Sequence, residues 1–197
     1  MNVSFDRIEA IIVGASAGGM VLIKQMIRVL PKDCLPVIVV QHMADLHELS
    51  WIEHLKDQGA VNVKEADEKE HILPGTVYLA PGNYHLLVEQ DRTFSLTIDQ
   101  REIFARPSIN VSFETAAACY GEKLLGIILS GGNSDGAEGA RCIKEAGGLL
   151  IVQDPLTAEA PAMPQAALLS AQPDLVAPPA KIMDLLSSLH HRTFKIS

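Results

Sequence analysis

Short apolar runs alternate with amphipathic stretches along most of this chain, and this alternation limits the folds open to it. Four runs are apolar enough to form strands buried on both faces, and they lie at 8–13, 37–40, 124–129 and 149–152. Helical spacing follows, as in Leu22, Met26 and Leu30, which share one face of a predicted helix over 20–30. Buried strands separated by helices indicate a mostly parallel sheet covered on both sides. We therefore expect a doubly wound, three-layer α/β fold with helices on both faces.

The remaining segments extend this pattern. Residues 61–98 hold short apolar pieces separated by Pro-Gly and Asp-Arg pairs, which indicates a strand followed by an antiparallel hairpin excursion. Pro107 is well placed as the first residue of a helix that ends before Gly121. Asp45 and Glu48 have the spacing of a capping box at a helix start. The other expected elements are helices at 45–58, 107–120, near 164–171 and near 179–190, a helix ending at 146, and a strand near 175–176.

Composition favours one globular domain over 1–197 and excludes several function classes. With 197 residues, 48% of them hydrophobic, the chain can bury a core of its own. No run reaches the roughly 18 apolar residues of a membrane span. A net charge of −8 argues against general nucleic-acid binding. Three widely spaced cysteines, Cys34, Cys119 and Cys142, suit neither a disulfide framework nor a zinc site, so the cytoplasm is the expected compartment.

Candidate catalytic side chains stand at the carboxyl ends of the predicted strands, where parallel sheets bind ligands. Gly14-x-Ser16-x-Gly18 matches the nucleophile elbow between a strand and a helix. A serine that merely caps the helix would give the same pattern. His42 directly follows the second strand and is a suitable base for a serine, although a lone histidine there can equally be a packing residue.

Two carboxylates compete for the third position of a triad. Asp135 precedes Gly136 at a predicted helix start, where it could also be an N-cap, and Asp154 ends another strand. Ser16, His42 and Asp135 lie at the same end of three strands, as a triad requires, but their order differs from that of α/β-hydrolases. A dinucleotide site is disfavoured, because its fingerprint needs glycine where Ser16 stands.

Six short stretches occur in order along the chain: Gly14-Ala15-Ser16-x-Gly18-Gly19, Gln41-His42-Met43, Tyr78-x-Ala80-Pro81-Gly82-x-x-His85, Arg106-Pro107-Ser108, Asp135-Gly136-Ala137 and Met163-Pro164. With these stretches the chain closely resembles the catalytic domain of CheB-type chemotaxis methylesterases. The resemblance implies that Ser16 is the nucleophile, His42 the general base and acid, and Asp135 the orienting carboxylate. It implies hydrolysis of glutamyl methyl esters on the cytoplasmic helices of chemoreceptors, with deamidation of glutamines as a second activity, and no metal or organic cofactor.

Further expectations follow from the same resemblance. The backbone N–H groups of Ala17 and Gly132 are expected to bind the oxyanion. Since methylated receptor segments are rich in glutamate, Arg101 and Arg106 are expected to steer them, with Phe104 as an apolar contact; arginines on a solvated loop are the alternative. A separate receiver or methyltransferase protein is a further expected partner. The chain begins close to its first strand, so we expect either a stand-alone member or a fragment without the usual receiver domain.

Three departures from the family's usual pattern leave the three catalytic residue types in place. Ala17 stands where threonine is usual, Gly131-Gly132-Asn133 replaces Gly-Met-Gly, and Ala44-Asp45 replaces a Pro-Pro pair. These departures could change the catalytic efficiency of the site and the receptor that it acts on. The alternative function is that of a weak or inactive relative that binds receptor or partner helices through the same cleft. A nucleotide-binding regulator is a third class.

Overall fold

A parallel sheet of seven strands forms the centre of this computed structural model, which describes residues 5–42, 48–103 and 105–189. The strand order is β3-β4-β2-β1-β7-β8-β9, and every neighbouring pair is parallel. The strands are β1 (Ala10–Ala15), β2 (Val37–Gln41), β3 (Asn62–Glu65), β4 (Thr76–Leu79), β7 (Leu124–Ile128), β8 (Leu149–Gln153) and β9 (Leu175–Ala177). The parallel sheet expected from the buried runs is confirmed.

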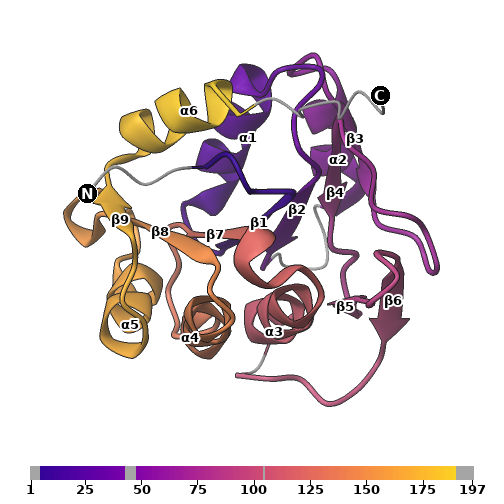
Figure 1. Cartoon of the computed structure of the whole chain (residues 1–197). Helices are drawn as coiled ribbons and strands as arrows, with labels where there is room; N and C mark the ends of the chain where they lie inside the picture. Colours follow the sequence, from indigo (N-terminus) through magenta and orange to yellow (C-terminus); the bar gives the residue numbers. More distant parts are fainter. Residues whose placement is uncertain (1–4, 43–47, 104, 190–197) are drawn as a thin grey trace.

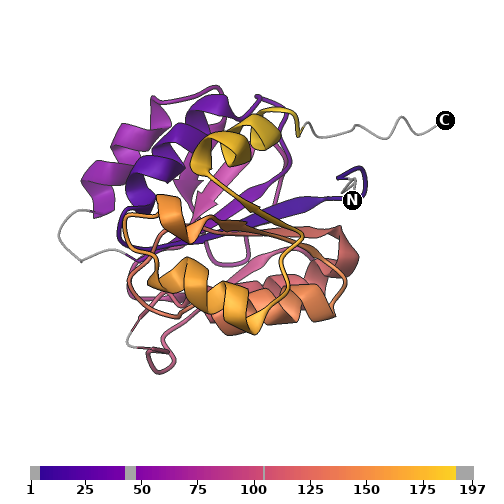
Figure 2. The same ribbon diagram turned by 90° about the vertical axis from the view of Figure 1, so that its left-hand side faces the viewer.

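Helices cover both faces of this sheet, so the fold has the three layers that the sequence predicts (Figures 1 and 2). One layer consists of α1 (Gly19–Val29), α2 (Glu48–Lys56) and α6 (Pro179–Ser187). The opposite layer consists of α3 (Ile109–Tyr120), α4 (Ala137–Glu145) and α5 (Ala162–Ser170). Single 3-10 turns, η1 (Gly121–Lys123) and η2 (Pro155–Thr157), precede β7 and follow β8.

The central strand β1 shows why these residues form a doubly covered strand. Ile11 and Val13 belong to the apolar core beneath α1 and α6, whereas Ile12 belongs to the core on the α3 side. All three side chains are fully buried. Their β-branched shape suits a strand, and burying each contributes roughly 1.5–3 kcal/mol to folding. A continuous β-branched run is therefore stable here, because neither face of β1 meets water.

The segment between β3 and α3 was only partly predicted. β3 and β4 are both parallel members of the main sheet, so the excursion is shorter than expected. The antiparallel hairpin consists of β5 (His85–Val88) and β6 (Phe94–Thr97), which form a separate two-stranded sheet. Tyr78 of β4 packs edge-on against Phe94 of β6, with ring centroids 5.0 Å apart. This aromatic contact holds the hairpin against the core.

The predicted start of the 107–120 helix is wrong by two residues. Ser108 is the N-cap of α3 in an extended conformation, and its hydroxyl accepts the Val111 N–H at 3.4 Å. Pro107 therefore lies before the cap rather than in the first turn. The predicted end is confirmed, since Gly121 caps the helix with φ +55°. The expected capping box at Asp45 and the Ala44-Asp45 departure lie outside the described residues.

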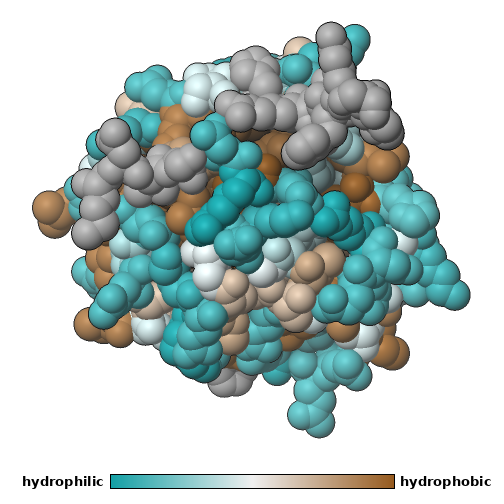
Figure 3. All heavy atoms as spheres, in the orientation of Figure 1, coloured by the Kyte–Doolittle hydropathy of each residue, from teal (hydrophilic) through white to brown (hydrophobic). Residues whose placement is uncertain are grey.

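The surface is mainly hydrophilic in the view of Figure 3, with hydrophobic side chains scattered between polar ones. Within the described ranges, no helix combines the length and the apolar character needed to cross a membrane.

Candidate active site

The candidate site lies where the strand order of the sheet reverses direction. From β1 the chain moves to β2 on one side, and β7 later pairs with β1 on the other side. Ser16 and His42 directly follow β1 and β2, and Asp135 lies in the loop after β7. Because Ala15 and Gln41 are paired in register, Ser16 and His42 leave neighbouring strands roughly 5 Å apart at the same level. A switch point of this kind is where open α/β sheets bind their ligands.

The Ser16 turn is held by backbone hydrogen bonds rather than by the serine hydroxyl. The Ser16 N–H donates to the Ser130 carbonyl at 2.9 Å, and the Ser16 carbonyl accepts the Gly19 N–H at 2.9 Å. Gly18 is the N-cap of α1 in a left-handed conformation (φ +79°), and no side chain caps this helix. The alternative in which Ser16 is only a helix cap is therefore wrong. The sharp bend falls on Gly18, since Ser16 is not among the described residues with positive φ.

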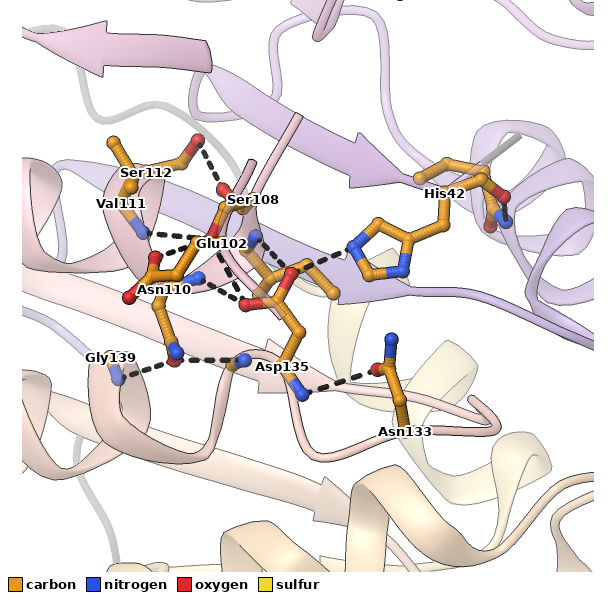
Figure 4. Close-up of polar contacts among 12 residues, drawn as sticks. His42, Glu102, Ser108, Asn110, Val111, Ser112, Asn133, Asp135 and Gly139 are labelled. Atoms are coloured by element: carbon orange, nitrogen blue, oxygen red, sulfur yellow. Dashed lines mark hydrogen bonds and ion pairs between the residues drawn. The ribbon is translucent and has the colours of Figure 1, made fainter. Parts of the chain in front are cut away.

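His42 and Asp135 form the closest ionisable pair of the site. His42 Nε2 lies 2.8 Å from Asp135 Oδ2, and the Asp135 side chain is fully buried (Figure 4). Asp135 also accepts the backbone N–H groups of Ile109 at 2.7 Å and Asn110 at 3.0 Å, and the Ser108 hydroxyl at 3.0 Å. Each oxygen of this carboxylate thus lies within hydrogen-bond distance of two protein groups.

Asp135 is not the cap of its own helix. The N-cap of α4 is Gly136, whereas the Asp135 carboxylate sits at the N-terminus of α3, where unpaired N–H groups and the helix dipole favour an anion. Burial raises the pKa of Asp135, but the hydrogen bonds from His42 and from the Ile109 and Asn110 N–H groups outweigh it, so the pKa lies below the usual value. The group is ionised at neutral pH and can hold a histidine in one orientation.

Asp154, the rival carboxylate, has another role. Its side chain is the N-cap of η2 and accepts the Leu156 N–H at 3.0 Å. The structure thus joins His42 to Asp135 and leaves Asp154 in a capping position.

The pairing through Nε2 determines which nitrogen of His42 can act as a base. A neutral imidazole that donates Nε2–H to a carboxylate keeps its lone pair on Nδ1. Nδ1 is therefore the nitrogen open to a serine proton. The Ser16 hydroxyl is half-buried and makes no hydrogen bond to His42 or to any other described residue. Catalytic hydrogen bonds are often long before substrate binds, so this geometry is compatible with a nucleophile and its base.

The two backbone groups expected in the oxyanion hole are both open to a ligand. Ala17 and Gly132 are exposed, and neither N–H is hydrogen-bonded within the described part of the chain. A Cβ added to Gly132 would meet no atom within 4 Å, so there is free space beside this residue. Next to it, Asn133 accepts the Asp135 N–H through its side-chain oxygen at 3.2 Å, which braces the loop that carries the carboxylate.

The three expected substrate contacts differ in their surroundings. Arg101 is exposed and its Nη2 lies 3.4 Å from the Asn83 side-chain oxygen. Arg106 donates through Nη1 to the carbonyls of Ile98 and Asp99, at 2.7 and 3.1 Å, and so holds its own loop. Phe104 lies outside the described residues.

Two polar residues of the site were not predicted as functional. Ser108 belongs to the Arg106-Pro107-Ser108 stretch. Its hydroxyl lies 3.0 Å from Asp135 Oδ1 and 2.8 Å from Glu102 Oε2, and the sequence did not predict either contact. Gln41 also belongs to a motif, and its side-chain amide binds the backbone of both Ser16 and His42. In the sequence, only their place in stretches shared with the family pointed to a function for Ser108 and Gln41.

Comparisons with known proteins identify the family of this chain. Residues 11–186 match the model of a protein family described as CheB methylesterase. A relative from Leptospira interrogans is 48% identical over 92% of this chain and 94% of its own length. Its name, protein-glutamate methylesterase/protein-glutamine glutaminase, is a provisional assignment. A relative of the same name from Clostridium acetobutylicum is 35% identical over 93% of this chain, which spans 53% of that longer protein.

A solved structure gives the same result for the fold. The catalytic domain of the Thermotoga maritima CheB methylesterase superposes with a TM-score of 0.86 at 32% sequence identity, covering 94% of this chain and 98% of that one. The names of these relatives carry the enzyme activity expected from the sequence. The chain therefore belongs to the CheB methylesterase family.

Proposed function

We propose that this protein is a protein-glutamate methylesterase that uses Ser16, His42 and Asp135 as a catalytic triad. The observation that carries the proposal is the 2.8 Å contact between His42 Nε2 and a carboxylate that is fully buried at the N-terminus of α3. A buried, ionised carboxylate holding one imidazole nitrogen leaves the other nitrogen directed at a neighbouring group, which is how a serine becomes a nucleophile.

The proposed acylation begins with proton transfer from the Ser16 hydroxyl to His42 Nδ1. The serine oxygen attacks the ester carbonyl carbon, and the N–H groups of Ala17 and Gly132 stabilise the oxyanion. His42 then returns its proton to the methoxy oxygen, the C–O bond breaks, and methanol leaves. Asp135 stabilises the imidazolium that exists between these two transfers.

The proposed deacylation reverses these roles with water. His42 takes a proton from a water molecule, whose oxygen attacks the acyl-serine carbon, and then returns the proton to the Ser16 oxygen. The product is a free glutamate side chain. A glutamine substrate would follow the same steps with ammonia as the leaving group, which accounts for deamidation as a second activity.

We further propose that the substrate is a glutamyl methyl ester on a cytoplasmic chemoreceptor helix, and that residues 1–197 form one catalytic domain acting in the cytoplasm. Exposed Arg101 is the proposed steering charge for such a glutamate-rich helix. Arg106, whose guanidinium binds carbonyls of its own loop, would act by holding the shape of the segment that carries Arg101. A separate receiver or methyltransferase protein remains a proposed partner.

Methanol release from methylated receptor membranes tests the function. The wild type should release methanol, and Ser16→Ala should reduce the rate by roughly 10³–10⁶-fold while the protein stays folded. A folded wild-type protein that releases none from several methylated receptors would contradict the esterase and favour a relative that only binds receptor or partner helices.

A further inference from the structure

Gln41 connects the two catalytic strand ends through a single amide group. It is the last residue of β2, and its Nε2 donates to the Ser16 carbonyl at 2.9 Å and to the His42 carbonyl at 2.8 Å. One NH₂ group thus uses both of its hydrogens on residues that lie 26 positions apart in the chain. The side chain is only 6% exposed, so water competes little for these two bonds.

We propose that Gln41 is a positioning residue for the esterase reaction, holding the nucleophile turn against the strand end that carries the base. This inference rests on the proposed function. Ser16 leaves β1 and His42 leaves β2, and the last backbone bond between these strand ends runs from the His42 N–H to the Ala15 carbonyl at 3.0 Å, one residue before the nucleophile. The Gln41 amide adds a bond to the Ser16 carbonyl itself. A displacement of about 1 Å between reacting groups can lower a rate by roughly 100-fold, so a bond of this kind affects catalysis.

The side-chain oxygen of Gln41 takes no part in this connection. The Gln41 Oε1 atom is buried and has no hydrogen-bond partner among the described residues. A buried acceptor without a partner destabilises a fold, and such groups are rare in native proteins. Gly19 leaves room for the amide, since a Cβ there would lie 2.5 Å from Oε1. An amide whose two hydrogens bind the backbone carbonyls of both proposed catalytic residues is suited to position them.

A second buried glutamine provides a matched control. Gln153 ends β8 as Gln41 ends β2, and it is 1% exposed. Its Oε1 accepts the Ser130 N–H at 2.8 Å and its Nε2 donates to the Thr157 carbonyl at 3.1 Å. Both polar atoms of Gln153 are therefore partnered, and neither binds Ser16 or His42.

The test compares Gln41→Met with Gln153→Met, because methionine has a similar length and no polar amide. We measure the thermal midpoint, the rate of labelling by a fluorophosphonate probe, and kcat and KM for methanol release. Gln41→Met removes the described donor to the His42 carbonyl, so it should lower Tm much as Gln153→Met does, but it should also label about 10- to 100-fold more slowly and lose kcat to the same extent with little change in KM. Gln153→Met should lower Tm by several degrees, because it leaves the buried Ser130 N–H without an acceptor.

Two results would overturn the inference: a Gln41→Met variant with wild-type labelling rate and kcat, or one that loses activity only in proportion to a lowered Tm. If Gln41→Met fails to fold, Gln41→Asn decides, because its shorter amide keeps the polar group but cannot span both carbonyls. The folded Gln41→Asn protein should label slowly, and a wild-type labelling rate would refute the inference. The probe needs the activated nucleophile but no receptor substrate. If the wild type releases no methanol but labels faster than the Gln41 variant, the result would therefore contradict the proposed substrate and still support the role of Gln41.

Discussion

Replacing Asp135 by asparagine changes the shape of the side chain little. It perturbs the site because four hydrogen-bond donors converge on this carboxylate. Oδ2 accepts the Ile109 N–H at 2.7 Å and His42 Nε2 at 2.8 Å, while Oδ1 accepts the Asn110 N–H and the Ser108 hydroxyl, each at 3.0 Å. Asparagine offers one oxygen and one NH₂ group in the same space. In either orientation, its NH₂ must face a backbone N–H that the carboxylate accepted.

The cost in stability has two parts. One buried N–H of α3 loses its acceptor, which costs about 1–3 kcal/mol. The negative charge at the helix N-terminus is also lost, which costs about 0.3–2 kcal/mol. If the NH₂ group faces His42, the ring must accept through Nε2 and carry its proton on Nδ1, where a base is needed. The wrong tautomer lowers kcat by about 10⁴-fold in a Ser-His-Asp hydrolase, so we expect a loss of roughly 10³–10⁴-fold.

Urea unfolding and methanol release measure the two effects on the same protein preparation. Asp154→Asn is the matched control, because Asp154 also follows a strand but only caps η2, and asparagine is an equally good N-cap. It should change the free energy of unfolding by less than about 0.5 kcal/mol and leave the rate unchanged. An Asp135→Asn protein that keeps a tenth of the wild-type rate, or that is as stable as Asp154→Asn, would refute the reasoning.

Three further predictions follow from the same contacts. The folded-state pKa of Asp135 is lowered, so the ionised carboxylate contributes its full stabilisation above the unfolded pKa near 3.9 and loses it as the pH falls through the folded pKa. The difference in unfolding free energy between wild type and Asp135→Asn should therefore shrink below about pH 4. A difference that stays constant with pH would contradict this. Gly18→Ala should lose about 1–2 kcal/mol in urea unfolding, because Gly18 has φ +79° and a Cβ would lie 2.8 Å from Ser130 Oγ; unchanged stability would show that the turn can rearrange. Charge reversal at Arg101, the exposed arginine, should raise KM for methylated receptor and weaken its salt dependence, whereas unchanged low-salt kinetics would exclude steering.

Much of the fold is predictable because the sheet is covered on both faces. A strand such as β1 must then be apolar at every position, and a continuous run such as Ile11-Ile12-Val13 predicts it directly. The hairpin region is harder, because β3 and β4 are short and only their pairing shows that they belong to the main sheet. The start of α3 was missed for a similar reason: proline and serine both suit a helix start, and only the backbone conformation of Ser108 decides between them.

The candidate catalytic residues can be predicted from their place after strands, whereas the residues that contact them cannot. Asp135 looks like the cap of α4 in the sequence, but it sits at the N-terminus of α3, which begins 26 residues earlier. The Gln41 amide likewise binds a turn from a different part of the chain. Such contacts depend on how helices and strands pack, which local spacing does not encode.

The central claim is that Ser16 is a nucleophile activated by His42, and the site of covalent labelling tests it most directly. A fluorophosphonate probe should modify one residue of the folded protein, identified as Ser16 by mass spectrometry of its peptides. His42→Gln should abolish rapid labelling, because the base is removed. Modification of another serine, or no modification of a folded wild-type protein, would contradict the proposed mechanism.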